Sequence, residues 1–174
     1  GLDAETAYAD IVSTFPEIWT DDYRGDGLAS IRMSCKSVRA KNFQKVYPQQ
    51  MPLHTAVFDG AWLYDPRETS HDPDDHNTWT YSTNLALMRL WHLTHPVGGK
   101  LSMDDMYLPE WKHAADICDQ SVTNRDGDTE KRYHGGFWFR AENDPVEIGK
   151  LMDQAAELVV YDRADGKVGV HAGE

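Results

Sequence analysis

Cysteine is scarce in this chain, and long apolar runs are missing from it. The 174 residues include 2 cysteines, Cys35 and Cys118, which stand far apart and form no C-x-x-C pair. This spacing is typical of packed thiols in a reducing compartment, with a single disulfide as the alternative. No apolar stretch approaches the roughly 20 residues of a membrane-spanning helix, so we expect no membrane span.

Positive charge is scarce as well. The chain has 17 Lys and Arg against 29 Asp and Glu, a formal net charge of -12 at pH 7. Because nucleic acids and anionic membranes are bound through Lys and Arg, this balance argues against a general binder of either kind. The basic residues that are present cluster over residues 32–45, which indicates a solvated face or a contact with an acidic neighbour. The cluster consists of Arg32, Lys36, Arg39, Lys41 and Lys45.

Catalytic signatures are absent from the sequence. It contains no G-x-S-x-G, no P-loop and no H-E-x-x-H motif. The strongest metal candidate is a loop with His71, Asp72, Asp74 and His76, since imidazole and carboxylate groups are ligands of Zn²⁺ and Mn²⁺. The two histidines are separated by a flexible acidic stretch, however, and a solvated loop is the preferred interpretation. We therefore predict no enzyme activity, no cofactor and no metal.

Aromatic residues are plentiful, which predicts a folded chain. Hydrophobic residues make up 40% and aromatic residues 11% of the sequence, with 6 Trp and 8 Tyr. Large aromatic side chains form cores and also interfaces between proteins. The candidates for these structural and interface roles are Trp62, Tyr64, Trp79, Trp91 and Trp111.

The first third of the chain has the pattern of β-structure. A short helix over residues 4–13, ended by Pro16, precedes strands predicted over 28–35, 43–47, 55–58 and 61–64. Asp59-Gly60 is typical of a hairpin turn between the last two strands. Residues 1–66 are thus expected to form a β-rich part, followed by a polar loop over 67–78.

The rest of the chain alternates helices and strands. Residues 83–94 and a segment beginning at Pro109 predict two central helices, and residues 132–140 predict a strand. Asp144, Pro145 and Glu147 are typical of a capped helix start with a capping box. A hairpin over 159–161 and 167–170, turned at Asp165-Gly166, closes the chain. The predicted class is α+β, and residues 79–174 are expected to form an α/β part that ends in a β-α-β-β unit. The β-rich part and the α/β part are either two domains or one continuous domain.

A series of short motifs stands in a characteristic order. They include Val57-Phe58-Asp59-Gly60, Tyr64-Asp65-Pro66-Arg67, Asn84-Leu85-Ala86-Leu87, Leu93-Thr94-His95-Pro96, Cys118-Asp119-Gln120-Ser121-Val122 and Tyr133-His134-Gly135-Gly136. Together they resemble the tail-tip proteins of long-tailed bacteriophages, the host specificity or tip attachment protein J family. Two departures are Leu85, where the family usually has proline, and Asp59, where it has a basic residue.

The resemblance implies a structural role at the end of a phage or prophage tail. Hubs of this family are trimers that cap the tail tube, built of β-barrel domains with inserted α/β domains, and no residue need be catalytic. The implied partners are other tail proteins and further copies of the chain. The implied location is the virion tail, and the host cytoplasm during assembly. The chain begins at Gly1 rather than Met, so we expect a piece of a longer hub protein.

Two other functions stay open on sequence grounds. One is a metal-dependent cell-wall hydrolase that uses the loop from His71 to His76. The other is a receptor-binding or glycan-binding module that uses exposed aromatic side chains such as Trp62 or Trp79.

Overall fold

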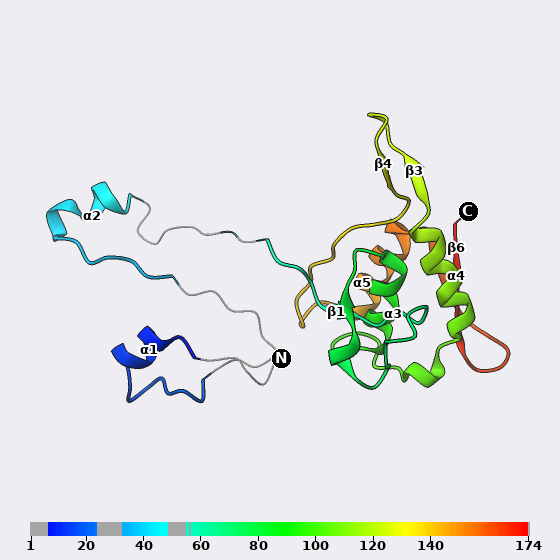
Figure 1. The fold of residues 1–174 in the computed structure, drawn as a ribbon, viewed down its shortest axis with the longest axis horizontal. Coiled ribbons are helices and arrows are strands. Elements are labelled where there is room, and N and C mark those ends of the chain that lie inside the picture. Colours follow the sequence, from blue (N-terminus) through cyan, green and yellow to red (C-terminus); the bar gives the residue numbers. More distant parts are fainter. Residues whose placement is uncertain (1–6, 24–32, 49–54, 56, 174) are drawn as a thin grey trace. The chain divides into compact units, whose positions relative to one another are not determined.

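The computed structural model describes residues 7–23, 33–48, 55 and 57–173 of the chain. The chain divides into two compact units, Gly1–Ala56 and Val57–Glu174 (Figure 1). The described residues form five α-helices and three two-stranded antiparallel sheets, so the predicted α+β class is confirmed. No helix in this described part is long and apolar enough to cross a membrane.

The first unit contains two short helices in its described residues. Helix α1 (Ala9–Thr14) falls in the region where a helix was predicted, although residues 4–6 lie outside the described part. Its end before Phe15 and Pro16 agrees with the predicted stop. The side chains of Ser13 and Thr14 both donate hydrogen bonds to the carbonyl oxygen of Asp10, at 3.1 and 2.6 Å.

The predicted strand over residues 43–47 is wrong, because helix α2 (Ala40–Val46) occupies this stretch. Alanine, lysine and glutamine favour helices, and they make up four of the seven residues of α2. Phe43 and Tyr47 stand four residues apart, and their ring centroids lie 5.5 Å from one another. This contact stabilises one helical turn but is impossible on one strand.

The expected β-rich part is not found in the described residues. The strand predicted over 28–35 falls mostly outside them, and Met33–Cys35 have no regular structure. The predicted hairpin at Asp59-Gly60 is wrong, since β1 (Trp62–Leu63) pairs instead with β2 (Thr80–Tyr81). Burial explains the choice: Leu63 is 4% exposed, and the neighbouring residues Tyr64 and Trp79 also enter the core.

The polar loop over 67–78 is built of turns that side chains hold in place. It contains one 3₁₀ turn, η1 (His76–Thr78), whose first residues are capped by the Asp75 carboxylate accepting from the backbone N–H of Asn77 at 3.0 Å. The indole N–H of Trp79 donates to the carbonyl oxygen of Asp72 at 2.7 Å. These bonds return the chain toward β2.

The two predicted central helices are confirmed as α3 (Leu85–Thr94) and α4 (Leu108–Cys118). Most of α3 is buried, in agreement with its nearly continuous apolar sequence. Pro109 lies in the first turn of α4, where its missing N–H removes no helical hydrogen bond. A second 3₁₀ turn, η2 (Met103–Asp105), precedes α4 and is closed by a capping box from Ser102.

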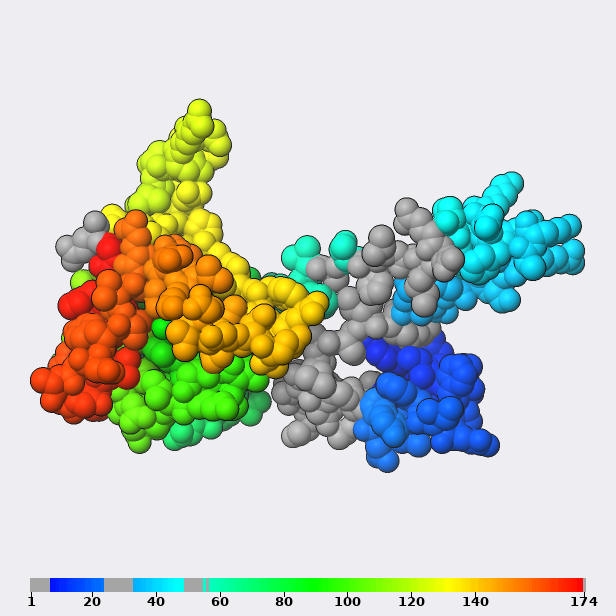
Figure 2. Space-filling model, turned by 180° about the vertical axis from the view of Figure 1, so that it is seen from behind, coloured from blue at the N-terminus to red at the C-terminus, as the bar shows by residue number. Residues whose placement is uncertain are grey.

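The strand predicted over residues 132–140 is wrong. A hairpin of β3 (Ser121–Thr123) and β4 (Thr129–Lys131) comes before this segment, and residues 124–128 form its turn. Residues 132–140 form only a single bridge, between His134 and Asn84. The hairpin projects from the rest of the second unit in both views (Figures 1 and 2).

The C-terminal part follows the prediction from Asp144 onward. Helix α5 (Pro145–Ala155) starts with the Asp144 carboxylate accepting from the N–H of Val146 at 2.9 Å. Glu147 forms an ion pair with Lys150 at 2.8 Å rather than closing the predicted capping box. Strands β5 (Leu158–Asp162) and β6 (Val168–Ala172) form the predicted hairpin. The element order is β4-α5-β5-β6, but its first strand ends at Lys131, before the predicted segment, and pairs with β3.

One core holds the second unit together, and α4 lies at its centre. Trp111 and Cys118 are both fully buried on α4, against α3 on one side and β6 on the other. Both cysteines are free. Packed thiols were predicted for both, and Cys118 is buried as predicted, whereas Cys35 is exposed. Burial raises the pKa of the Cys118 thiol, which disfavours the reactive thiolate.

Candidate functional site

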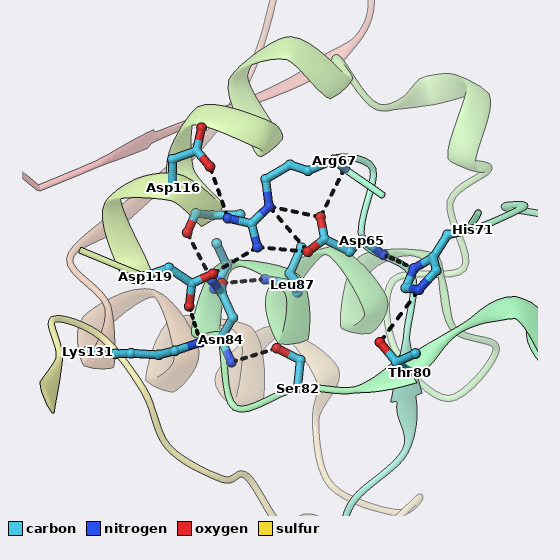
Figure 3. A network of polar contacts seen from close by, with 12 residues as sticks. Asp65, Arg67, His71, Thr80, Ser82, Asn84, Leu87, Asp116, Asp119 and Lys131 are labelled. Atoms are coloured by element: carbon cyan, nitrogen blue, oxygen red, sulfur yellow. Dashed lines mark hydrogen bonds and ion pairs between the residues drawn. The ribbon is translucent and has the colours of Figure 1, made fainter. Parts of the chain in front are cut away.

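A polar network in the second unit is centred on Arg67 (Figure 3). It begins in the turn Asp65-Pro66-Arg67. The Arg67 guanidinium donates to both carboxylate oxygens of Asp65, from Nε at 2.9 Å and from Nη2 at 2.7 Å. The backbone N–H of Arg67 donates to the same carboxylate at 3.0 Å. The three donors fix the turn and aim the guanidinium at α4.

Two more carboxylates, at the end of α4, reach the same guanidinium. Arg67 Nη1 donates to Asp116 at 3.0 Å, and Nη2 donates to Asp119 at 2.8 Å. Lys131 at the end of β4 donates to the other oxygen of Asp119 at 2.6 Å. The network thus joins the turn after β1, the end of α4 and the β3–β4 hairpin (Figure 3).

Asn84 ties α3 to the same region. Its side-chain oxygen caps α3 by accepting from the backbone N–H groups of Ala86 and Leu87, at 3.1 and 3.2 Å. Its amide group donates to the carbonyl oxygen of Ala115 on α4 at 2.9 Å. Asn84 is 1% exposed, so these bonds are made without competition from water.

The charges of the network favour the ionised forms of Asp65 and Asp119. Burial by itself raises the pKa of Asp65, but hydrogen bonds from the Arg67 side chain and backbone outweigh it, and the pKa is lowered. Burial likewise opposes the shift at Asp119, where Lys131 and Arg67 lower the pKa. The hydrogen bond to Asp65 raises the pKa of Arg67 above its ordinary value. Groups held in one charge state are poorly suited to general acid–base catalysis, which needs a pKa near the working pH.

These shifts predict that the Arg67 network stabilises the fold less in acid. We compare wild type with Arg67→Met. Because the folded pKa values of Asp65 and Asp119 are lowered, their stabilisation is present above the ordinary pKa of 3.8 and is lost as pH falls through the folded values. The difference in unfolding free energy between the two proteins should therefore hold from neutral pH down to about pH 5 and shrink as the pH falls further, as measured by urea unfolding. A difference that stays constant would contradict this.

His71, the first metal candidate, already uses both ring nitrogens within the fold. Its Nδ1 accepts from the backbone N–H of Asp65 at 3.0 Å. Nε2 then carries the proton and lies 3.5 Å from the hydroxyl of Thr80 (Figure 3). Metal binding through either nitrogen would require breaking the bond to Asp65 or reversing the tautomer.

The other candidates of this loop are also held by local contacts. His76 stacks on Trp79 with ring centroids 4.0 Å apart. The Asp72 carboxylate accepts from the backbone N–H of Asp74 at 2.9 Å, and the Asp74 side chain is exposed. Among the residues that the structure describes, no group of three or more His, Cys, Asp or Glu could hold a metal ion.

The five aromatic candidates divide between core and surface. Tyr64, Trp79 and Trp111 are buried core residues, so the suggestion of an exposed Trp79 that stacks on sugars is wrong. Trp62 is 48% exposed, and it lies opposite the exposed Tyr81 in the β1–β2 pair. Trp91 is partly buried against the core and stacks on His95, with ring centroids 4.1 Å apart.

Trp91 also lines an apolar groove on the second unit, which we call the aromatic groove. Its volume is about 380 Å³. The rings that line it come from three places: the segment before β1, helix α3 with strand β2, and the irregular stretch 136–141. These rings belong to Phe58, Tyr81, Trp91, Phe137, Trp138 and Phe139. Because few polar groups line the groove, it suits apolar side chains better than a sugar.

Sequence reasoning missed Arg67 as the centre of the polar network. The available signal was the motif Asp65-Pro66-Arg67, in which a carboxylate and a guanidinium flank a proline that favours a turn. The groove could not be found this way, because its walls come from distant parts of the sequence. No protein-family model matches the chain, and no curated protein matches it either.

Proposed function

We propose that this chain is a structural part of a phage or prophage tail tip, within the hub at the end of the tail tube. The proposal begins from the ordered motifs that resemble tip attachment proteins. Three of them, around residues 64–67, 84–87 and 118–122, are far apart in the sequence. Their spacing by itself gives no reason why they should occur together.

The observation that carries the proposal is that these three motifs meet in the Arg67 network. Asp65 and Arg67 come from the first motif and Asp119 from the third, while Asn84 of the second donates to Ala115 on α4, close to the third motif. Their polar groups are engaged in bonds that join the elements of the second unit, and Cys118 of the third motif is buried beside them. Residues with this role preserve a shape, which is what a scaffold protein requires.

The proposed work of the chain is therefore packing rather than catalysis. Its partners would be neighbouring tail proteins and further copies of itself in a trimer. It would act in the virion tail and assemble in the host cytoplasm. The exposed ring of Trp62 and the aromatic groove are surfaces of the kind that protein interfaces cover.

Immunogold electron microscopy of particles from the strain that encodes the chain tests the proposal. An antibody raised against the chain is applied to purified particles, and we expect gold at the free end of the tail. Particles from a strain that lacks the gene serve as the control and should carry no gold. Intact tails that contain none of the protein, by labelling and by mass spectrometry, would overturn the proposal.

A further inference from the structure

Residues 36–47 form a segment with no core of its own. None of the described residues of the first unit is buried, and α2 contains no buried side chain. Phe43 is 42% exposed and Val46 is 51% exposed. The hydroxyl of Tyr47 donates to the carbonyl oxygen of Lys36 at 2.7 Å, which closes the segment on itself. A helix this short is marginal in water without a surface to pack on.

This segment is basic, whereas the second unit is acidic. No Asp or Glu stands between Asp26 and Asp59, and the stretch between them holds the whole basic cluster. In residues 57–174, acidic residues outnumber basic ones by two to one. The two surfaces therefore attract one another at long range.

The aromatic groove of the second unit has a matching rim. Phe58 and Ala141 line the groove, and each is followed in the sequence by an acidic residue, Asp59 and Glu142. Both acidic residues are exposed, and so is Asp144 at the start of α5. One basic residue, Arg140, lies on the same stretch and pairs with Glu142 at 3.6 Å. The groove thus presents apolar rings inside and excess negative charge at the edge.

We propose that residues 36–47 of one copy of the chain dock in the aromatic groove of a second copy. Phe43, Val46 and Tyr47 follow the three- and four-residue spacing of one helix side and supply the apolar contacts. Lys41 and Lys45, four residues apart, lie on the other side of this short helix, and their long side chains supply the positive charge that the acidic rim attracts. A contact of this kind joins two different surfaces, so successive copies form either a closed ring or an open fibre.

The mass of the full chain in solution tests this docking. Sedimentation velocity is run up to about 100 µM, a concentration that nearly saturates a contact with a Kd of about 1 µM. We expect the wild-type mass to rise with concentration. In the charge-reversal variant Lys41→Glu/Lys45→Glu, and separately in Trp138→Ala, the Kd should rise roughly 30-fold, as for the loss of an interface hot spot. Trp138 is 79% exposed, so its removal leaves the fold intact.

A matched control and a mixing experiment complete the test. Lys112→Glu/Lys167→Glu changes the charge by the same amount at exposed sites outside the groove lining and should associate like wild type. Mixing Lys41→Glu/Lys45→Glu with Trp138→Ala leaves one intact segment and one intact groove, so a species of two chains should form. A wild type that stays monomeric at every concentration overturns the proposal. Docking of the segment within its own chain would give that result. A mixture that stays monomeric, or variants that associate like wild type, would also overturn it.

The result is independent of the tail-tip proposal. Association through the groove with no protein in tails would reject the tail-tip function alone. Gold at the tail end with a monomeric wild type would reject the docking contact alone.

Discussion

Replacing Trp111 by alanine should lower the free energy of unfolding by about 4 kcal/mol. Trp111 is fully buried on α4, and its indole N–H donates to the carbonyl oxygen of Val168 on β6 at 3.3 Å. The substitution leaves a cavity between α4 and the β5–β6 hairpin. It also removes the donor that helps hold β6 in place. The loss should appear in urea unfolding followed by circular dichroism, which does not depend on tryptophan fluorescence.

Two further variants separate the causes of this loss. Trp138→Ala makes the same substitution at a side chain that is 79% exposed, and should leave stability nearly unchanged. Trp111→Phe keeps most of the buried ring and removes the hydrogen bond to Val168, so it should cost about 1 kcal/mol. Equal losses in Trp111→Ala and Trp138→Ala would show that α4 does not lie in the core.

Arg67→Met should lower the unfolding free energy at neutral pH by about 3 kcal/mol, the typical result of removing one partner from a buried ion pair. The side chains of Arg67 and Asp65 are 23% and 12% exposed, so water screens the remaining charges only in part. Asp65, Asp116 and Asp119 would face one another without the cation between them. Chemical unfolding near pH 7 measures the loss.

Controls identify unpaired charge as the reason. Arg140→Met removes an arginine from a pair whose side chains are 66% and 70% exposed, and it should change stability by less than about 0.5 kcal/mol. Adding Asp65→Asn and Asp119→Asn to Arg67→Met should restore part of the loss, because the uncompensated carboxylates are gone. If the triple variant were less stable than Arg67→Met, the repulsion argument would fail.

Local patterns predicted the helices and the hairpin that lie closest to the core. Helices α3, α4 and α5 were foreseen because their apolar spacing, the prolines in the first turns of α4 and α5, and the Asp144 cap of α5 act within a few residues. The β5–β6 hairpin was foreseen from the pair Asp165-Gly166, and Gly166 has the positive φ of 79° that its turn needs. Each of these signals is complete within one element.

Errors arose where two distant segments compete for the same partner. The turn at Asp59-Gly60 favours a local hairpin, yet β1 pairs with β2 because that pairing brings Tyr64 and Trp79 into the core. Apolar and polar residues alternate over 132–140 as in a strand. The stretch nevertheless makes a single β-bridge, from His134 to Asn84, and the Asn84 side chain is hydrogen-bonded to α3 and α4. Alternation predicts which faces are apolar, and it does not say whether a neighbouring strand is available.

The sequence by itself determined the α+β class, the acidic character and the Asp144 cap of α5, because these depend on composition and short-range spacing. It also contained the motifs whose residues build the Arg67 network. Only the tertiary structure decided that Asp65, Arg67, Asn84 and Asp119 meet, and that rings from three distant segments line one groove. Such meetings depend on which long-range contacts bury the most apolar surface, and no local pattern carries that information.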